Sequence, residues 1–327
     1  MAHVPGARRS RAGPLGLART AVDAARLLAR GDPHGVVNDA PARVVVIGDA
    51  LIDELVDPSG TTRIVGGSAL NVAVGLSVLG VPATLVAMVG DDADGALIRE
   101  HLAAHGVLIV PTITAAGTGI ARSERVGGEP RYAFSESMVA RSLAFDEAQR
   151  AAIADAALVA VSGFPFDVPE QLGLLEDAVG ASSAVVAVDP NPRPGLLHDR
   201  EAYRGGLERF GAATALLKVG DDDTRLLYGT DAVQTMPRLG GVFPRLLVTR
   251  GEHGVVLVDG DSSWSRPTAA SAVVDTMGAG DSVFATALAA IAVAGIDGMN
   301  WPAVLERCMA IAAATIAHPG ALLRLPE

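Results

Sequence analysis

Hydrophobic residues along the chain fall into two alternating kinds of segment. Short runs rich in β-branched residues, the first at Arg43–Gly48, predict buried strands. Longer stretches with apolar positions at helical spacing, such as Ala69–Leu79 and Asp94–Ala104, predict helices. Further strands are expected at residues 84–89, 158–161, 185–188, 215–217, 246–249 and 255–258, and further helices at 146–154, 170–179, 201–209, 222–227, 282–294 and 302–317. The alternation predicts an α/β fold with a mainly parallel sheet covered by helices on both faces.

Two segments interrupt this alternation and have the pattern of β hairpins. One runs from Glu54 to Val65 and contains a polar turn at Asp57–Gly60. The other runs from Ile120 to Ser135, and its residues alternate around a Gly127–Gly128 pair, as in a hairpin. We therefore expect a small antiparallel sheet outside the main one, a lid formed by about residues 54–66 and 118–136.

The composition limits the class of protein. Half of the 327 residues are hydrophobic and 19% are charged, so the chain can bury a substantial core and wholesale disorder is excluded. The net charge of −11 argues against a nucleic-acid partner, since phosphate backbones attract basic surfaces. The longest apolar stretch, Val283–Gly295, is shorter than the roughly twenty residues that span a bilayer, so no membrane partner is expected. The single cysteine, Cys308, excludes an internal disulfide framework and fits a cytoplasmic protein.

The first forty residues differ from the rest in charge. Six arginines between Arg8 and Arg30 accompany a single aspartate, Asp23, although the protein as a whole is acidic. The Arg8–Arg9 pair is not followed by the continuous apolar core of an export signal. We expect residues 1–40 to form a poorly ordered or loosely attached extension and residues 41–327 to form the folded domain.

The sharpest chemical signal is Asp275-Thr-Met-Gly-Ala-Gly-Asp281, which directly precedes an apolar helix. Its small residues, Gly278 to Gly280, let a ligand approach the backbone, and the N–H groups at a helix N-terminus attract anions. A carboxylate there, Asp281, repels a phosphate but suits a base that takes a proton from an attacking hydroxyl. The alternative is an ordinary capping role for Asp281.

Together with a second glycine motif, this segment resembles a known family. Asp275–Asp281 is similar to the C-terminal signature of the ribokinase/PfkB carbohydrate kinases, and Gly66-Gly-Ser-Ala-Leu-Asn71 resembles their N-terminal signature. The resemblance extends in order from about residue 44 to residue 322. It implies a Rossmann-like three-layer α/β/α fold, a β-sheet lid, and transfer of the γ-phosphoryl group of MgATP to a sugar hydroxyl.

The resemblance also implies roles around the transferred phosphoryl group. Asp281 matches the catalytic base, and the N–H groups of Gly278, Ala279 and Gly280 match an anion hole. These roles agree with the chemistry, because a loose phosphoryl transition state needs alignment and hydrogen-bond donors more than covalent help.

On the sugar side, the resemblance implies four binding residues, Asp53, Gly66, Gly67 and Asn71. Asp53 would accept hydrogen bonds from neighbouring hydroxyls, the glycines would let the backbone approach the sugar, and Asn71 offers both a donor and an acceptor. The alternatives are a solvated loop acid for Asp53, a plain turn for the glycine pair and a buried helix-start residue for Asn71.

On the nucleotide side, Thr249-Arg-Gly-Glu-His-Gly254 resembles the family's loop at a strand end, which assigns Thr249, Gly251 and Gly254 to ATP. A hairpin turn would also explain these glycines. Asn191 and Lys218 are assigned to ATP as well, and Asn191 lies in Asp189-Pro-Asn-Pro-Arg193, which resembles fructokinases and 2-keto-3-deoxygluconate kinases. The chain has no G-x-x-x-x-G-K-[ST] motif, which excludes a P-loop kinase.

Two acidic residues are candidates for cations. Asp223 lies where the family's magnesium motif has an acid, so the resemblance implies that it holds Mg²⁺ through a bound water. Asp275 matches a residue beside a monovalent cation, such as K⁺, in the family. The alternatives are helix capping for Asp223 and orientation of the loop for Asp275.

The sequence therefore predicts an ATP-dependent sugar kinase whose partners are ATP and a fructose-like sugar or a keto-sugar acid. One alternative is a nucleoside kinase of the same fold, for which Tyr132, Phe134 and Phe164 are the available aromatics. Another is a regulatory protein that binds sugar and nucleotide without turnover. A homodimer through the lid is also expected, because unpaired strand edges attract partners.

Overall fold

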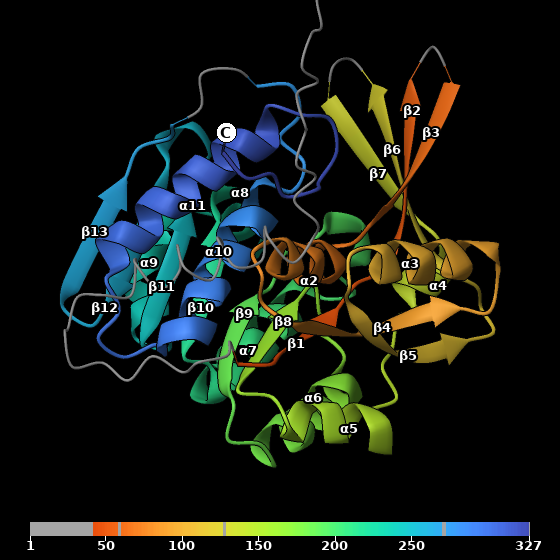
Figure 1. The fold of residues 1–327 in the computed structure, drawn as a ribbon, viewed down its shortest axis with the longest axis horizontal. Coiled ribbons are helices and arrows are strands. Elements are labelled where there is room, and N and C mark those ends of the chain that lie inside the picture. The colour runs from red at the N-terminus through yellow and green to blue at the C-terminus, as the bar shows by residue number, and fades with distance from the viewer. Residues whose placement is uncertain (1–41, 58–59, 127–128, 270–272, 327) are drawn as a thin grey trace, which may run out of the picture.

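The computed structural model describes residues 42–57, 60–126, 129–269 and 273–326. The extension expected at residues 1–40 lies outside these ranges. Within them, the chain forms a large sheet with helices on both faces and a smaller sheet that projects from the body (Figure 1). The predicted α/β fold class is confirmed. No helix in the described part of the chain is long and apolar enough to cross a membrane.

The large sheet is parallel from β5 to β11, and β12 and β13 extend it with antiparallel pairs. In spatial order its strands are β13 (Ser262–Arg266), β12 (Val255–Asp259), β11 (Arg245–Thr249), β10 (Leu216–Gly220), β9 (Val185–Asp189), β8 (Leu158–Ser162), β1 (Val44–Gly48), β4 (Ala83–Gly90) and β5 (Leu108–Thr114). The central strands β1 and β8 are buried at every position, because both faces of the sheet are covered.

Helices cover the two faces in two groups, each with its own apolar core. The buried apolar side chains of one face come from α2 (Ser68–Val78), α3 (Ala93–Ala104), α10 (Ala279–Ala294) and α11 (Trp301–Ile316). Those of the other face come from α5 (Glu147–Ala154), α6 (Pro169–Gly180), α7 (Arg200–Phe210), α8 (Asp221–Tyr228) and α9 (Ala232–Gly240). Short turns complete the described part: α4 (Glu136–Val139), η1 (Pro194–Leu196), η2 (Gly211–Ala213) and η3 (Gly251–His253).

Helices α2 and α10 lie against each other at close range. A Cβ added to Gly75 of α2 would lie 3.0 Å from the Cβ of Ala285 in α10, so glycine permits the contact. From Ser282 to Val293 every residue of α10 is buried, which explains the continuous apolar character of this segment. The packing brings the first turns of α2 and α10 together, so that Ser68 and Asn71 contact Asp281.

The smaller sheet consists of β3 (Gly60–Gly66), β2 (Leu51–Asp57), β6 (Gly119–Val126) and β7 (Glu129–Phe134), in that spatial order. As predicted, β2–β3 and β6–β7 are antiparallel hairpins. The two hairpins join through a parallel pair, β2–β6, which the hairpin pattern alone did not indicate. Figure 1 shows this sheet extending away from the large one.

Besides the short turns α4, η1, η2 and η3, two strands and one helix were not predicted from the sequence. Strand β5 contains Pro111 in its middle, which weakens a strand pattern but is tolerated at the edge of a sheet. Strand β13 is polar and half-exposed, so it has no apolar alternation to detect. Helix α9 contains Pro237, a residue that usually argues against a helix interior.

Candidate active site

A cleft of about 1060 Å³ lies between the carboxyl ends of the large sheet's strands and the smaller sheet. Ligands collect at this edge of open α/β sheets. Most of the residues singled out in the sequence line the cleft: Asp53, Gly67, Asn71, Asn191, Lys218, Asp223, Thr249, Gly251, Asp275, Gly278, Gly280 and Asp281. The other three, Gly66, Ala279 and Gly254, are not part of its wall.

The N-terminus of α10 faces the cleft through Gly278 and Gly280. Gly278 has a φ of 75°, in the left-handed region that favours glycine, and a Cβ there would lie 2.6 Å from the carbonyl oxygen of Ala321. The N–H of Ala279 donates to the carbonyl oxygen of Thr276 at 3.3 Å, whereas those of Gly278 and Gly280 have no acceptor within the described residues. The helix therefore presents open backbone donors at its positive end.

The carboxylate of Asp281 is held by two side chains from the first turn of α2. Ser68 Oγ donates a hydrogen bond to Oδ1 (2.8 Å), and Asn71 Nδ2 donates one to Oδ2 (2.9 Å). Ser68 Oγ also lies 2.6 Å from the Oγ of Ser162, at the end of β8. The sequence pattern indicated a sugar contact for Asn71 and no role for either serine. A lone serine carries no signal when its partner, Asp281, is 213 residues away.

Beneath Gly280, a buried ion pair closes the floor of the cleft. Lys218 Nζ donates a hydrogen bond of 2.7 Å to Asp189 Oδ2, and both side chains are buried. A Cβ on Gly280 would lie 3.0 Å from Lys218 Nζ, so the ammonium lies directly against the start of α10. The second oxygen of Asp189, Oδ1, has no hydrogen-bond partner within the described residues.

The charges around this pair keep the ammonium protonated. Burial lowers the pKa of Lys218, but the carboxylates of Asp189, Asp223 and Asp281 together raise it above its ordinary value. Burial raises the pKa of Asp189, and the ammonium of Lys218 opposes that shift. The floor of the cleft thus carries a positive charge among three acids.

Asp53 extends from β2 into the cleft beside the glycine pair. A Cβ on Gly66 would lie 2.0 Å from Asp53 Oδ2, and Gly67 has a φ of 110°. Gly66 therefore makes room for the carboxylate, while Gly67 lines the cleft itself. Burial and, to a lesser extent, repulsion from Asp281 raise the pKa of Asp53 to about 6, and Arg193 opposes the rise. Asp53 lines the cleft, where an ionised carboxylate can accept hydrogen bonds.

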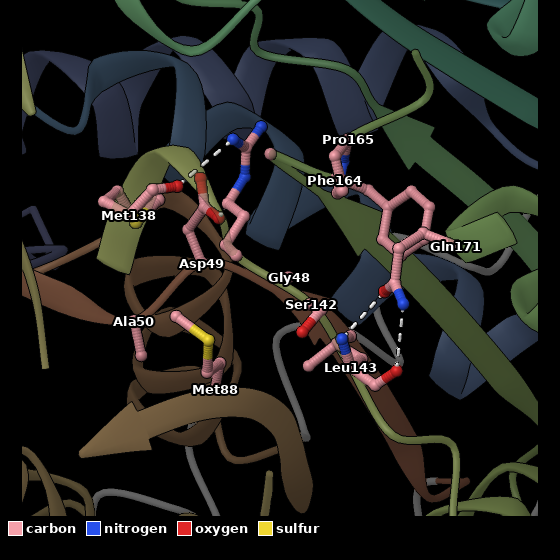
Figure 2. Close-up of a pocket in the computed structure, with 12 residues that line it drawn as sticks. Gly48, Asp49, Ala50, Met88, Met138, Ser142, Leu143, Phe164, Pro165 and Gln171 are labelled. Carbon is pink, nitrogen blue, oxygen red and sulfur yellow. Dashed lines mark hydrogen bonds and ion pairs between the residues drawn. The ribbon is translucent and has the colours of Figure 1, made fainter. Parts of the chain in front are cut away.

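A second, much smaller cavity of about 20 Å³ lies behind Asp49 (Figure 2). Arg141 Nε lies 3.3 Å from Asp49 Oδ1, and the side-chain amide of Gln171 is hydrogen-bonded to the backbone of Leu143. Burial raises the pKa of Asp49 to about 6, against the opposing charges of Arg141 and Arg193. A space of this size holds about one water molecule, so the small cavity is a packing feature behind the cleft.

Of the residues predicted to contact ATP, Thr249 ends β11, and Gly251 and Gly254 lie in the turn between β11 and β12. Thr249 Oγ1 donates to the carbonyl oxygen of Val219 at 3.4 Å. Gly251 has a φ of 51°, and Gly254 has a φ of 81° with the carbonyl oxygen of Arg266 only 2.0 Å from where its Cβ would lie. Gly254 is therefore required by the turn into β12. Asn191 lines the cleft with a φ of 40°, a left-handed conformation that asparagine adopts more readily than most residues.

The two acids proposed for cations each hold backbone N–H groups. Asp223 Oδ2 accepts from Gly220 N (2.7 Å) and caps α8. Asp275 accepts from Met277 N (3.0 Å) and from Gly320 N (2.9 Å), which fixes the loop before α10. Among the described residues, no group of three or more His, Cys, Asp or Glu side chains is placed to hold a metal ion.

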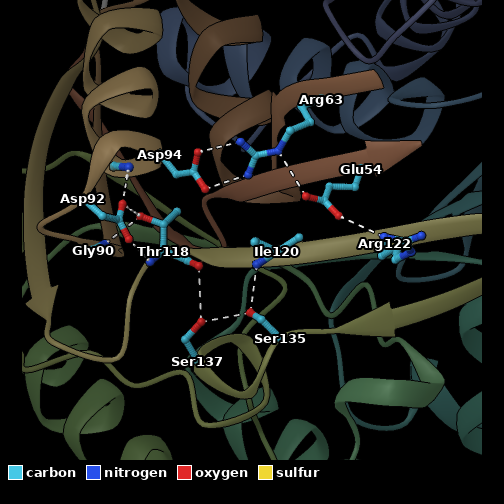
Figure 3. A network of polar contacts seen from close by, with 11 residues as sticks. Glu54, Arg63, Gly90, Asp92, Asp94, Thr118, Ile120, Arg122, Ser135 and Ser137 are labelled. Carbon is cyan, nitrogen blue, oxygen red and sulfur yellow. Dashed lines mark hydrogen bonds and ion pairs between the residues drawn. The ribbon is translucent and has the colours of Figure 1, made fainter. Parts of the chain in front are cut away.

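Arg63 of β3 connects the smaller sheet to the body (Figure 3). Its guanidinium donates to both carboxylate oxygens of Asp94, at 3.0 and 2.7 Å, and its Nε donates to Glu54 at 3.1 Å. Arg122 of β6 forms an ion pair of 3.7 Å with the other oxygen of Glu54. Because Asp94 lies in the first turn of α3, this network links the smaller sheet to a helix of the body.

Comparison with known sequences connects this geometry to a family. Residues 41–327 match the profile described as pfkB family carbohydrate kinase. The chain is similar to a fructokinase of Rhizobium leguminosarum bv. trifolii, with 28% identity over 259 residues that cover 76% of this chain and 79% of the relative. It is also similar to the bifunctional protein HldE of Azorhizobium caulinodans, with 32% identity over 321 residues, 85% of this chain and 62% of that protein's length.

Solved structures show the same fold. A crystal structure of fructokinase with bound ATP from Xylella fastidiosa has a TM-score of 0.75 and 23% identity, covering 87% of this chain and 95% of its own. A fructokinase double mutant from Vibrio cholerae O395, in a fructose, ADP and potassium ion bound form, has a TM-score of 0.75 and 19% identity, covering 88% and 96%. These likenesses confirm the ribokinase-like fold expected from the motifs.

Proposed function

This chain belongs to the pfkB family of carbohydrate kinases, and we propose that Asp281 is the general base when a phosphoryl group is transferred from MgATP. Enzymes of this family are phosphotransferases that use a sugar hydroxyl as the acceptor. The observation that supports this most directly is the convergence at the start of α10. The carboxylate of Asp281 and the open N–H groups of Gly278 and Gly280 face one cleft. A base beside an anion site is what an alcohol attacking a terminal phosphate requires.

In the proposed reaction, Asp281 aligns the sugar hydroxyl and takes its proton while the oxygen attacks the γ-phosphorus. The new oxygen–phosphorus bond forms as the bond to the leaving ADP breaks. Each carboxylate oxygen of Asp281 accepts one bond from α2, which leaves a lone pair for the substrate. The N–H groups of Gly278 and Gly280, with the ammonium of Lys218 below them, stabilise the charge on the transferred group.

Mg²⁺ would enter with ATP, and Asp223 is the residue that would hold it. Asp223 lines the cleft and uses only Oδ2 for its helix cap, so Oδ1 fits an ion that keeps its own water shell. When bound, Mg²⁺ neutralises charge on the phosphates.

Asp275 also lines the cleft, and its two backbone bonds leave lone pairs that fit a monovalent cation such as K⁺. Because the reaction consumes ATP, we place it in the cytoplasm.

The acceptor sugar would bind at the Asp53 end of the cleft. Asp53 accepts from sugar hydroxyls, and the exposed Arg193 lines the same end of the cleft, with no hydrogen-bond or ion-pair partner for its guanidinium within the described residues. A neutral ketose uses the Asp53 contact alone, whereas a keto-sugar acid also pairs with Arg193. The similarity to fructokinase favours a fructose-like sugar, and Arg193 keeps a sugar acid as the second candidate.

One observation keeps a nucleoside acceptor as an alternative. Tyr132 and Phe134 of β7 are stacked, with ring centroids 6.4 Å apart, and both line the cleft. Aromatic faces of this kind hold a nucleobase or the apolar face of a sugar ring. Phe164 is fully buried and is no longer a candidate for contact with a nucleobase.

The edge strands of the smaller sheet, β3 and β7, would form the expected homodimer. Sedimentation velocity of the purified chain tests this.

The decisive experiment is ADP release by the purified full-length chain over a panel of acceptors. The panel contains fructose, other hexoses, 2-keto-3-deoxygluconate and adenosine. Each acceptor is assayed with the parent protein and with the Asp281→Asn variant. We expect turnover with a ketose or a keto-sugar acid and a loss of about a hundredfold or more in Asp281→Asn, with ATP binding retained. Binding of ATP and sugar without turnover for any acceptor would instead support the regulatory protein. Full activity in Asp281→Asn would remove Asp281 as the base.

A further inference from the structure

We propose that Ser68 is a positioning residue for phosphoryl transfer, the middle member of a hydroxyl relay that runs from Ser162 to the carboxylate of Asp281. The proposal rests on the proposed function, since it takes Asp281 as the base. Nothing in the glycine motif around Ser68 points to this role. It follows from three oxygen atoms that the fold brings together from β8, α2 and α10.

The direction of the relay follows from the number of available hydrogens. A serine hydroxyl has one hydrogen to donate, and Ser68 directs it to Asp281 Oδ1 at 2.8 Å, because an ionised base only accepts. The 2.6 Å contact between Ser68 and Ser162 is therefore a bond that Ser162 donates and Ser68 accepts. Hydrogen bonds in such a chain polarise and strengthen one another, so Ser162 stabilises the bond that holds the base.

The far end of the relay is anchored at the centre of the large sheet. Ser162 is fully buried and is the last residue of β8, paired in register with Gly48 of β1. A Cβ on Gly48 would lie 1.7 Å from the carbonyl oxygen of Ser162, so β1 and β8 lie close at this point. Through Ser68, the carboxylate of Asp281 is thus connected by hydrogen bonds to β8, which pairs with β1 in the buried part of the sheet.

The relay holds the orientation of the carboxylate plane. Rotation about χ2 of an aspartate is only weakly restricted, so donors are needed to keep a lone pair directed at the incoming hydroxyl. Asn71 holds Oδ2 and Ser68 holds Oδ1. With one donor removed, the carboxylate samples other planes, and the loss is in alignment of the reacting groups. Ser68 is 7% exposed and its hydrogen is already used, so a direct sugar contact is not its role.

The test is a double-mutant cycle in the full-length chain with the acceptor that supports turnover. We expect Ser68→Ala to lower kcat about tenfold or more, because hydrogen bonds to charged groups are among the stronger ones. The KM values of sugar and ATP should stay within twofold of the parent. Ser162→Ala lowers kcat less, and in the Ser68→Ala background it has no further effect, since it acts only through Ser68. The matched control is Ser77→Ala, on the last turns of the same helix, where the hydroxyl bonds the His105 carbonyl oxygen; its kinetics stay unchanged.

A fall in kcat with the KM values and the Tm close to those of the parent separates positioning from a purely structural role, which would lower the Tm as well. An unchanged kcat in Ser68→Ala, additive effects of the two serine substitutions, or a rise in sugar KM alone would overturn the relay. If Asp281→Asn keeps full activity, the proposed base fails first. If Asp281→Asn is inactive and Ser68→Ala is normal, only the relay fails.

Discussion

Lys218 Nζ lies 2.7 Å from Asp189 Oδ2, and this buried pair lies directly under Gly280. Lys218 is the only lysine among the 327 residues, and all the other residues counted as Lys or Arg are arginines. The space between Gly280 and Asp189 accepts a compact ammonium, whereas a planar guanidinium needs a wider fork of acceptors. One oxygen of Asp189 has no partner within the described residues, so the pair carries its charge in a region with few compensating bonds.

Replacement of Lys218 by methionine leaves Asp189 buried without its counter-ion. We expect the free energy of unfolding to fall by about 3–5 kcal/mol at pH 8 and by less at pH 5. The reason is that burial already raises the pKa of Asp189 above its unfolded value of 3.8, and loss of the ammonium raises it further. A carboxyl group whose pKa is raised on folding stabilises the protein at pH values below its unfolded pKa. This contribution is lost as the pH rises through the pKa of the folded state. Urea denaturation at the two pH values measures the difference.

The control for this prediction is the Lys218→Met, Asp189→Asn double variant. Without the buried charge, its stability should recover in part at pH 8 and no longer depend on this titration. An equal loss in Lys218→Met at both pH values would show that packing, and not the unpaired carboxylate, causes the effect.

Substitution of Gly280 by alanine tests how tightly the start of α10 is packed over the ammonium. The new Cβ would lie 3.0 Å from Lys218 Nζ, so the ammonium or the helix start must shift by a few tenths of an ångström. We expect kcat/KM for ATP to fall about tenfold, because small displacements in a preorganised site are costly. Steady-state kinetics with varied ATP measure this.

The matched control is Gly173→Ala within α6, where nothing lies within 4 Å of the new Cβ. That variant should gain about 0.5–1 kcal/mol of stability with unchanged kinetics. A Gly280→Ala enzyme with parental kcat/KM would show that the anion end tolerates displacement.

Sugar affinity should depend on the ionisation of Asp53. Its pKa is raised to about 6 by burial and by Asp281, so most of the ionised acceptor is lost between pH 7 and pH 5. At saturating ATP we expect the sugar KM to rise about tenfold from pH 8 to pH 5, following the ionised fraction. In Asp53→Asn the KM is higher at pH 8 and no longer follows this titration. Asp49, whose pKa is also raised to about 6, provides the comparison: if Asp49→Asn removes the dependence and Asp53→Asn keeps it, the assignment is wrong.

The Arg63–Asp94 pair should affect substrate binding more than stability. Arg63 is 43% exposed, and exposed pairs contribute about 1 kcal/mol or less. We expect Arg63→Ala to leave Tm nearly unchanged but to raise the sugar KM about threefold at low ionic strength, because the smaller sheet loses its link to α3. In 1 M NaCl the difference from the parent should shrink, since the Debye length is then about 3 Å. Arg209→Ala, which breaks a comparable pair with Glu176 far from the cleft, is the control and keeps the parental KM.

Much of the fold could be read from local pattern. The β-branched runs at Val44–Gly48 and Val185–Asp189 became central strands because a strand buried on both faces needs apolar residues throughout. Edge strand β5 and helix α9 were missed because each contains a proline that only its position in the fold makes acceptable. The parallel joining of the two hairpins through β2 and β6 depends on how distant segments meet, which alternation within one hairpin does not encode.

The site divides in the same way. Residue type and spacing along the chain suffice for the helix start at Gly278–Asp281, for Asp53 after the first strand and for the turn glycines, because a helix dipole, a strand end and a positive φ are local properties. The partners of these groups are a different matter. Ser68 reaches Asp281, and Lys218 reaches Asp189, only after α2 packs on α10 and β9 lies beside β10. Hydrogen bonds form over about 3 Å, a distance that depends on the packing of the whole core and is not recorded in any short stretch of residues.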